Sequence, residues 1–577
     1  MKKNKKMNRN DLIILIAVIL CVLTYLLNLC GVFDLRLNLA YTNEYNISNV
    51  NTTGYTRQQV VFGDSAYTKI GRNAVNTLQS GIGVDIQAVR RCRDEFLDKA
   101  YRQEIGRQGF YESQYEAVCE IESQFGEMQG VKFQEIVDNL KSSMNELALN
   151  PTSNVARSAL VQSSVAFIDR ANEIYNSLKK YQNTLNTKIA SMVDRVNELG
   201  STIQELNSQI TKIEADGEKA NDLRDQRDAA LDELGALVKI DYGEDYKGQV
   251  EINVEGIPFL SSNSLLTMST EVIEGTDMVK PVWDYMEKRD VFNLDVEIST
   301  EKNNDIGELK GLLLARGDGV PGYDALEDAQ AYEKYIEPSV IMKTFAGFDN
   351  LVHAIITDIN DVLCPDEDTE RTITTAEGIQ VTGIFLDMEK TAYGMDDARS
   401  VGVELFSRNY TDRYIKLTGA DGKTYYMRND TNAFGNESKY TLGNVSVNTE
   451  VLANYGKIPL TSKNGEEAFE KAEELLDLWK KEELKLNPSG GDAENYSSYY
   501  NSFIYDIGNT GEFMNNMASS ESAMAQSLDN RRQEVAGVSS DEELTNMIKF
   551  QNAYNASSRY ITVVSEMLEH LIERLGA

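Results

Sequence analysis

The sequence is poor in the residues on which most catalytic and metal sites depend. Histidine occurs twice in 577 residues, at His353 and His570, and the two are far apart in the chain. The cysteines form no C-x-x-C pair and are odd in number, which argues against a disulfide framework or a zinc site. They are Cys21, Cys30, Cys92, Cys119 and Cys364. We therefore expect neither a metal nor a cofactor.

Basic residues are outnumbered by acidic ones. The chain has 57 Lys and Arg against 91 Asp and Glu, a net charge of −34. A nucleic-acid-binding protein needs a basic face for the phosphates, so no nucleic acid partner is expected. Eight prolines and a hydrophobic fraction of 41% argue against a disordered or collagen-like chain. At roughly 100–200 residues per domain, the length predicts about three or four folded domains.

One long apolar run stands near the start of the chain. Leu12–Phe33 is interrupted only by Thr24, Asn28 and Gly31, and it follows the basic segment Met1–Asp11. As a helix it would span about 33 Å at ~1.5 Å per residue, enough for the core of a bilayer. The basic flank would stay in the cytoplasm, and no A-x-A-like cleavage site follows. Taken alone, residues 1–33 predict a basic N-terminus and a transmembrane helix.

Helical periodicity dominates residues 86–240. The polar segment before it, 34–85, predicts loops and short strands, and Asn150-Pro151 should end one helix and start the next. Ala220–Val238 is predicted to fold back on a long helix that carries a heptad pattern. This pattern comprises Leu178, Tyr181, Leu185, Ile189, Met192, Val196, Leu199, Ile203, Leu206, Ile210 and Ile213. We interpret it as structural helix packing.

Strand patterns follow in two regions. In 241–362, alternation through Val250–Val254 and a turn at Glu255-Gly256 predict a hairpin, and helices at Ile306–Leu314 and Ile341–Val362 complete a core. Residues 363–510 are predicted to form a mostly β outer domain. It should contain a hairpin of Tyr414–Leu417 and Tyr425–Arg428, a helix at Gly465–Leu484 and a linker at Asn487–Asn495.

Residues 511–577 carry the clearest helical pattern. Ser540 and Glu543 are predicted to form a capping box that starts a helix ending near Leu575. Its apolar residues repeat at spacings of 3 and 4, so the helix needs a partner from this chain or from a neighbouring subunit. This assembly seam consists of Met547, Phe550, Tyr554, Ser557, Ile561, Val564, Leu568, Leu571 and Leu575.

Candidates for chemistry are few. Asp366–Asp368 could attract a cation, but its carboxylates are adjacent, and a solvated loop is the better interpretation. Gly81-Ile82-Gly83 lacks the third glycine of a phosphate-binding loop. Arg316-Gly317-Asp318 matches an adhesion tripeptide, but its position after a helix favours an ordinary turn. No catalytic arrangement stands out, so the chain is not expected to be an enzyme.

A twelve-residue segment, Asn46–Arg57 (NISNVNTTGYTR), closely resembles the N-terminal signature of bacterial flagellar rod, hook and hook-associated proteins. Such a run suits a loop in which side chains satisfy backbone groups after a helix ends, with Gly54 free to take a positive φ. The residues of this axial motif are Asn46, Asn49, Asn51, Thr52, Gly54, Tyr55 and Arg57.

Three further segments resemble the hook-associated protein 1 family in particular: residues 83–104, 220–239 and 527–576. The long helical block of 86–240 favours this family over plain hook and rod proteins. The resemblance implies a mainly α fold with a β-rich insertion, in which terminal helices form a coiled coil, a long helical bundle lies next and a β domain faces outward.

The resemblance also implies a function and partners. It points to a self-assembling structural subunit of the extracellular flagellum at the hook–filament junction, needed for filament assembly. The partners would be further copies of the chain, the hook protein and the next hook-associated protein towards the filament. Export would use the flagellar type III apparatus, with a chaperone on the C-terminal helix.

The N-terminus departs from the family pattern. Members begin with an amphipathic helix before the motif, whereas here Leu12–Phe33 and Asp34–Tyr45 occupy that place. Three explanations stay open: a frameshift or mispredicted start, a tolerated variant of the usual helix, or a membrane-anchored offshoot. The alternative function is accordingly a membrane-anchored coiled-coil surface protein that reuses the flagellar fold.

Overall fold

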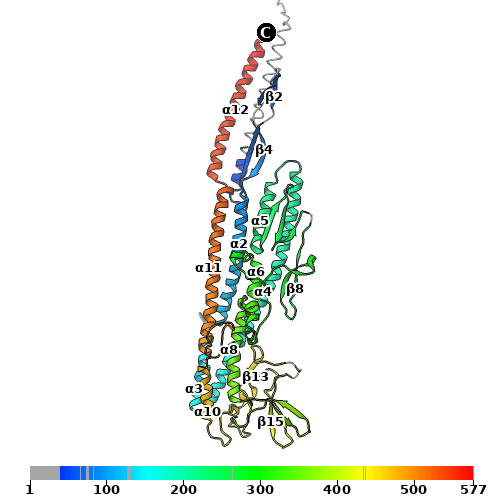
Figure 1. Cartoon of the computed structure of the whole chain (residues 1–577). Helices are drawn as coiled ribbons and strands as arrows, with labels where there is room; N and C mark the ends of the chain where they lie inside the picture. Colours follow the sequence, from blue (N-terminus) through cyan, green and yellow to red (C-terminus); the bar gives the residue numbers. More distant parts are fainter. Residues whose placement is uncertain are drawn as a thin grey trace, which may run out of the picture. The chain divides into compact units, whose positions relative to one another are not determined.

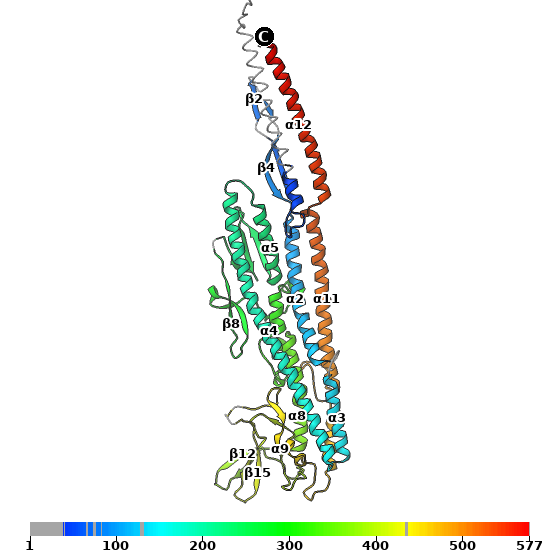
Figure 2. The same ribbon diagram turned by 180° about the vertical axis from the view of Figure 1, so that it is seen from behind.

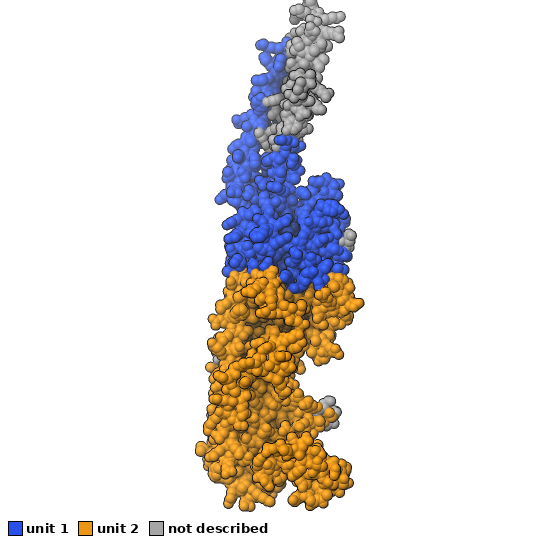
Figure 3. All heavy atoms as spheres, viewed as in Figure 1, with its two compact units in different colours: residues 1–105, 196–266, 522–577 blue, residues 106–195, 267–521 orange. Residues whose placement is uncertain are grey.

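The computed structural model describes residues 39, 41–64, 67–72, 77–81, 84–126, 132–262, 264–432, 435 and 437–575. The chain divides into two compact units, coloured separately in Figure 3. Unit 1 combines residues 1–105, 196–266 and 522–577, and unit 2 combines residues 106–195 and 267–521. Each unit is thus built from segments that are far apart in the sequence.

Helices make up most of the described chain, as Figures 1 and 2 show, and this confirms the mainly α fold class. The expected break at Asn150-Pro151 is present, because α3 ends just before it and α4 begins just after it. The helices are α2 (Glu95–Phe125), α3 (Phe133–Leu149), α4 (Asn154–Glu214), α5 (Asn221–Leu237), α6 (Glu308–Arg316), α7 (Ala329–Ala331), α8 (Val340–Leu363), α9 (Thr449–Ala453), α10 (Phe469–Asp477), α11 (Tyr496–Ala536) and α12 (Ser540–Leu575).

The strands form small antiparallel sheets of two or three members each in the described chain. In unit 1, β1 (Gln58–Asp64) pairs with β4 (Val84–Arg91), β2 (Tyr67–Arg72) with β3 (Thr77–Gly81), and β5 (Ile240–Glu244), β6 (Val250–Val254) and β7 (Ile257–Leu260) form a meander. In unit 2, β9 (Val279–Trp283) is the central strand of a three-stranded sheet, between β8 (Met268–Val272) and β10 (Arg289–Asp290). Three two-stranded sheets follow, which pair β11 (Arg371–Thr374) with β12 (Gln380–Gly383), β13 (Phe406–Arg408) with β16 (Val445–Val447), and β14 (Tyr414–Thr418) with β15 (Thr424–Arg428).

The core of unit 1 lies between α4 and the β5–β6–β7 meander. The predicted alternation is confirmed, since Val250, Ile252 and Val254 are buried and the hairpin turns at Glu255-Gly256 with positive φ at both residues. On α4, Gly200 is required for close packing, because a Cβ there would lie 2.5 Å from Phe259 Cζ. The meander therefore packs directly on the backbone of the long helix.

The core of unit 2 is aromatic and joins five helices. Phe125 at the end of α2 packs edge-on against Phe348 of α8 and Phe503 of α11, at centroid distances of 5.1 and 5.4 Å. Phe133 of α3 lies 5.7 Å from Phe167 of α4. Edge-on aromatic pairs add about 0.5–1.5 kcal/mol each beyond the burial of their area, so this cluster fixes the bundle.

Several predicted boundaries differ from the structure. Residues 41–48 are helical rather than looped, and the helical region begins at Glu95, because β4 continues to Arg91. Residues 496–510, counted above with the outer domain, belong to α11. The helix expected at Gly465–Leu484 is shorter, with α10 ending at Asp477 and one 3-10 turn after it.

The start of α12 also corrects the predicted capping box. The hydroxyl that caps the helix is that of Ser539, whose Oγ accepts a hydrogen bond from Glu542 N at 3.4 Å. Two serines stand side by side, and the capping position therefore falls one residue earlier than predicted. Glu543 is left free to reach across to Arg57.

Candidate functional site

The axial motif begins at a buried asparagine that joins a helix end to a strand. Asn46, 1% exposed, lies in the helical segment 41–48. Its Oδ1 accepts hydrogen bonds from Tyr55 OH (2.7 Å) and Gln58 N (3.0 Å), and its Nδ2 donates to Gln58 O (3.0 Å). Three bonds from one amide hold the first residue of β1 against the helix. An aspartate could not supply the donated bond.

The middle of the motif is a loop held by its own side chains. Asn49 Nδ2 donates to Tyr45 O at 3.0 Å, which satisfies a carbonyl at the helix end, and Thr52 Oγ1 donates to Asn49 Oδ1 at 3.2 Å. Gly54 has a φ of +79°, as predicted. Asn51 is exposed and its side chain makes no hydrogen bond to a described residue.

Arg57 ties the motif to the C-terminal helices. Its backbone N donates to Ala536 O, the last residue of α11, at 2.8 Å. Its guanidinium contacts the first turn of α12, with Nε 3.0 Å from Glu543 Oε1 and Nη1 3.6 Å from Glu542 Oε2. Glu543 is only 2% exposed, so Arg57 supplies the charge that lets this carboxylate be buried.

Behind the motif lies an ionic network that we call the clamp, which links β4, α2, α5 and α11 within unit 1. Asp228 is its centre, because Arg91, Arg93 and Arg102 all contact its carboxylate, at 2.6, 3.0 and 3.5 Å. Arg532 of α11 joins the network through a carboxylate of α2 and one of α5. The clamp residues are Arg91, Arg93, Asp98, Arg102, Asp225, Asp228, Asp232 and Arg532.

The protonation of the clamp follows from this geometry. Burial alone would raise the pKa of Asp228, but the three arginines outweigh it and lower the pKa below its ordinary value. The pKa of Tyr45 is raised to about 12, chiefly because its hydroxyl donates to Asp222, with burial adding to the shift. The centre of the clamp is therefore an ion-pair network of Asp228 with three arginines, which suits the positioning of the segments that it joins.

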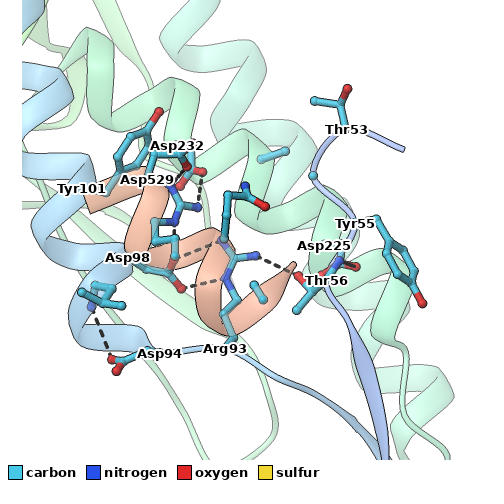
Figure 4. A pocket seen from close by; sticks show the side chains of 16 residues that line it. Thr53, Tyr55, Thr56, Arg93, Asp94, Asp98, Tyr101, Asp225, Asp232 and Asp529 are labelled. Carbon is cyan, nitrogen blue, oxygen red and sulfur yellow. Dashed lines mark hydrogen bonds and ion pairs between the residues drawn. The ribbon is translucent and has the colours of Figure 1, made fainter. Parts of the chain in front are cut away.

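The motif and the clamp enclose an open cavity of about 300 Å³ (Figure 4). Thr56 contributes through its backbone N, which donates to Asp225 Oδ2 at 3.0 Å, and Arg93 lies between Asp98 and Thr56. The cavity is lined by Gly54, Tyr55, Asp232 and Arg532, among others. Charged pairs already occupy its walls, so we interpret it as part of the positioning apparatus.

The clamp is not predicted from the sequence, although residues 220–239, which include its α5 segment, resemble the family. Asp222, Asp225, Asp228 and Asp232 are spaced 3, 3 and 4 residues apart and thus share one face of α5. That acidic face was the available signal. Its arginine partners come from segments about 130 and 300 residues away, and no local pattern could identify them.

The assembly seam of α12 is half-buried in the structure. Of its residues, Ser557 is buried and Leu571 is 46% exposed. Met547, Phe550, Tyr554, Ile561, Val564 and Leu568 are intermediate in exposure, and the side chain of Leu575 lies outside the described residues.

A second apolar stripe runs along α12 beside the seam, and it was not predicted from the sequence. Tyr560, Val563, Met567 and Leu571 follow spacings of 3, 4 and 4 and are 50%, 44%, 62% and 46% exposed. Exposed apolar side chains in a continuous row mark an interaction surface. We call these four residues the outer stripe, which shares Leu571 with the seam.

The other candidates have structural roles. Asp366 pairs with Arg413 and Arg428 at 3.3 and 3.0 Å, and in the part of the chain that is described no group of three potential ligands could hold a metal. Arg316 is fully buried and donates to Val279 O, so the tripeptide is a turn rather than an adhesion loop. Residues 82 and 83 lie outside the described chain.

The predicted transmembrane helix, Leu12–Phe33, falls outside the described residues. Among the helices that are described, none combines the length and the apolar character needed to cross a bilayer.

Comparison with known proteins supports the family resemblance that the axial motif indicates. The family described as flagellar hook-associated protein FlgK helical domain matches residues 118–363, and that described as flagellar basal body rod FlgEFG protein C-terminal matches residues 530–574. The chain is 28% identical to flagellar hook-associated protein 1 of Bacillus subtilis (strain 168), over 93% of this chain and 95% of that protein. It is 23% identical to the protein of the same name from Escherichia coli (strain K12), over 92% and 96%.

A solved structure shares the fold. It is the flagellar hook junction protein FlgK from Burkholderia pseudomallei, with a TM-score of 0.50 and 12% identity, and the match covers 76% of this chain and 100% of that one.

Proposed function

We propose that this chain, which belongs to the flagellar hook-associated protein 1 family, is a structural subunit of the junction between the flagellar hook and filament. The observation that carries the proposal is the match to hook-associated protein 1 over 93% of the chain. The family is structural, and the chain is not an enzyme. Its place of action is the extracellular flagellum.

The geometry of unit 1 supports a role of the motif in assembly. Arg57 and the clamp fix the end of α11 and the start of α12 against β1, α2 and α5. A helix anchored at its base presents its apolar residues in a defined direction, which lowers the entropy lost when it packs against another subunit. The half-buried seam and the outer stripe of α12 then provide two adjacent packing surfaces.

We propose the partners that membership of the family implies. They are further copies of this chain, the hook protein and the next hook-associated protein towards the filament. The export apparatus and a chaperone that covers the C-terminal helix before secretion complete the set. Because the seam and the outer stripe are both apolar, a chaperone would protect them until subunits assemble.

Assembly in cells tests the proposal. In a strain that lacks its own copy of the gene, the full chain should restore filaments, and Ile561→Asp, in the seam, should abolish incorporation because it places an unpaired charge in the packing surface. Thr562→Asp, at an exposed neighbouring position, is the control and should assemble. Normal filaments made with Ile561→Asp would contradict the role of α12.

The apolar run Leu12–Phe33 favours one alternative, a membrane-anchored surface protein. Intact mass and N-terminal peptide mapping of the protein from sheared flagella distinguish the two. A junction subunit is recovered with the flagella, whereas an anchored protein stays in the membrane fraction after a high-salt wash with peptides of 12–33 present.

A further inference from the structure

A second cavity, in the β-rich part of unit 2, is not used by the proposed assembly function. It measures about 400 Å³ and all its lining residues belong to 401–450, from β13, β14, β15, β16 and the start of α9. Figure 2 shows β15 and α9 in this part of the molecule. Its volume falls within the range of about 300–1,000 Å³ that is typical of ligand pockets.

Charged side chains in the lining are almost completely buried. Glu404, Arg408 and Arg413 are 3%, 3% and 4% exposed. Arg413 is held by Asp361 (2.6 Å) and Asp366 (3.3 Å). Burying charged groups is costly unless each has partners. If the cavity bound no ligand, an apolar lining would stabilise the fold more than this charged lining does.

The two other charged groups are positioned by Tyr440. Its hydroxyl donates to Glu404 Oε2, and the Arg408 guanidinium lies over its ring at 4.7 Å. Arg408 donates to Ser438 O at 2.6 Å, yet its buried Nε has no hydrogen-bond partner among the described residues. The lining side chains are thus held in place, while the Nε donor of Arg408 remains available for a hydrogen bond.

An aromatic ring stands in the lining with no packing role. Tyr410 is 90% exposed and has a φ of +58°, a left-handed conformation that is unfavourable for a tyrosine. The loop is fixed on both sides, because Asn409 N donates to Asn444 O and Thr411 N donates to Arg408 O. Strained residues of this kind cluster at ligand-binding positions.

The lining selects against three ligand classes. No group of three potential metal ligands occurs in the described chain. The arginines already donate to carboxylates and carbonyls, and the chain has a net charge of −34, so an anion is disfavoured. An apolar ligand would leave the buried Nε of Arg408 without a hydrogen-bond partner.

A ligand with many hydroxyls and an apolar ring face meets these conditions. We propose that the cavity binds a neutral saccharide, with Tyr410 as the platform for the sugar ring and Glu404 as a hydrogen-bond partner. Burial raises the pKa of Glu404 to about 7, so near neutral pH its carboxyl can donate to a hydroxyl or accept from one. The proposal is independent of the junction function, and either can fail without the other.

Saturation-transfer NMR on the full chain tests it, with D-glucose, D-galactose and N-acetyl-D-glucosamine as probes. We expect saturable binding of at least one sugar in the millimolar range. Tyr410→Ala should weaken it about tenfold, the loss of one aromatic contact. Tyr246→Ala, at a residue 91% exposed in unit 1, is the matched control and should bind normally.

Thr449→Trp, an exposed lining position, provides a second variant that should block the cavity without touching the buried charges. Circular dichroism verifies that each variant folds. The proposal is overturned if none of the three sugars gives a saturable signal, or if binding survives both variants. It is also overturned if only D-glucuronate or inorganic phosphate binds, since that would make the cavity an anion site.

Discussion

Helices α4 and α12 carry the same heptad pattern but bury it to different extents. On α4, the pattern residues from Leu185 to Ile210 are 0–9% exposed, and only the last, Ile213, is exposed, at 40%. On α12, most pattern residues are half-buried, and the outer stripe beside them is 44–62% exposed. The same periodicity thus describes a helix whose pattern is buried and a helix whose pattern, among the described residues, is only partly buried.

The difference teaches what a heptad pattern specifies. It specifies that a helix has an apolar side, but the number of neighbours is set by the rest of the chain. α4 has α5 and the β5–β6–β7 meander beside it, as the hydrogen bonds of Asn207 Nδ2 to Val250 O and of Arg227 Nη1 to Asn207 Oδ1 show. A helix with an exposed apolar row and an anchored base suits a subunit that adds to an assembly.

The largest effect on folding is expected from α4. Ile203 is fully buried, so Ile203→Ala should lower the free energy of unfolding by about 2–5 kcal/mol through the cavity that it leaves. Ile213→Ala, ten residues later in the same pattern but 40% exposed, should cost less than about 0.5 kcal/mol. Urea denaturation followed by circular dichroism measures both. Equal losses of unfolding free energy in the two variants would mean that the difference in burial between Ile203 and Ile213 does not affect stability.

A smaller effect is expected at the base of α12. Arg57→Ala removes the partner of the buried Glu543 carboxylate, and we expect a loss of about 1–3 kcal/mol in unit 1. Arg57 is about one-third exposed, which keeps the loss below that of a fully buried pair. Hydrogen exchange should also accelerate in the first turns of α12.

Arg57→Lys is the control for that variant, because it keeps the charge but not the two-pronged contact with Glu542 and Glu543. It should recover part of the loss. Unchanged exchange in both variants would show that the motif does not hold the base of α12.

Sequence reasoning predicted the parts of this comparison that depend on local chemistry. The axial loop, the positive φ of Gly54, the break at Asn150-Pro151 and the hairpin at Glu255-Gly256 follow from residues that act on their own neighbours. The two heptad patterns were also predicted, because periodicity is local. The interpretation of the α4 pattern as internal packing agrees with its burial.

The parts that depend on distant segments were not predicted. The clamp needs Arg93, Asp228 and Arg532 to approach one another, and nothing near any of them in the sequence names the others. Tyr560, Val563 and Met567 of the outer stripe were not predicted, because they stand out only when exposure is known. The capping residue was predicted one position too late, at Ser540 instead of Ser539, because both serines carry the same hydroxyl group.

The capping position can be tested by an adjacent pair of variants. Ser539→Ala should destabilise α12 by about 0.5–1 kcal/mol, because its Oγ accepts from Glu542 N, whereas Ser540→Ala should have almost no effect. The change in hydrogen exchange at the helix start measures both. A larger effect for Ser540→Ala would restore the capping box predicted from the sequence.

The outer stripe should give the smallest effect on folding and the clearest effect on assembly. Met567 is 62% exposed, so Met567→Asp should change the free energy of unfolding of the isolated chain by less than about 0.5 kcal/mol. In the assembled junction the same carboxylate would be enclosed by a neighbouring subunit, and an unpaired charge there costs several kcal/mol. Incorporation into flagella should therefore fail while the melting curve stays unchanged. Thr562→Asp, on the other side of α12, should alter neither. If Met567→Asp assembled normally, only the half-buried seam would remain as the packing surface, and α12 would resemble α4 more closely than its exposure indicates.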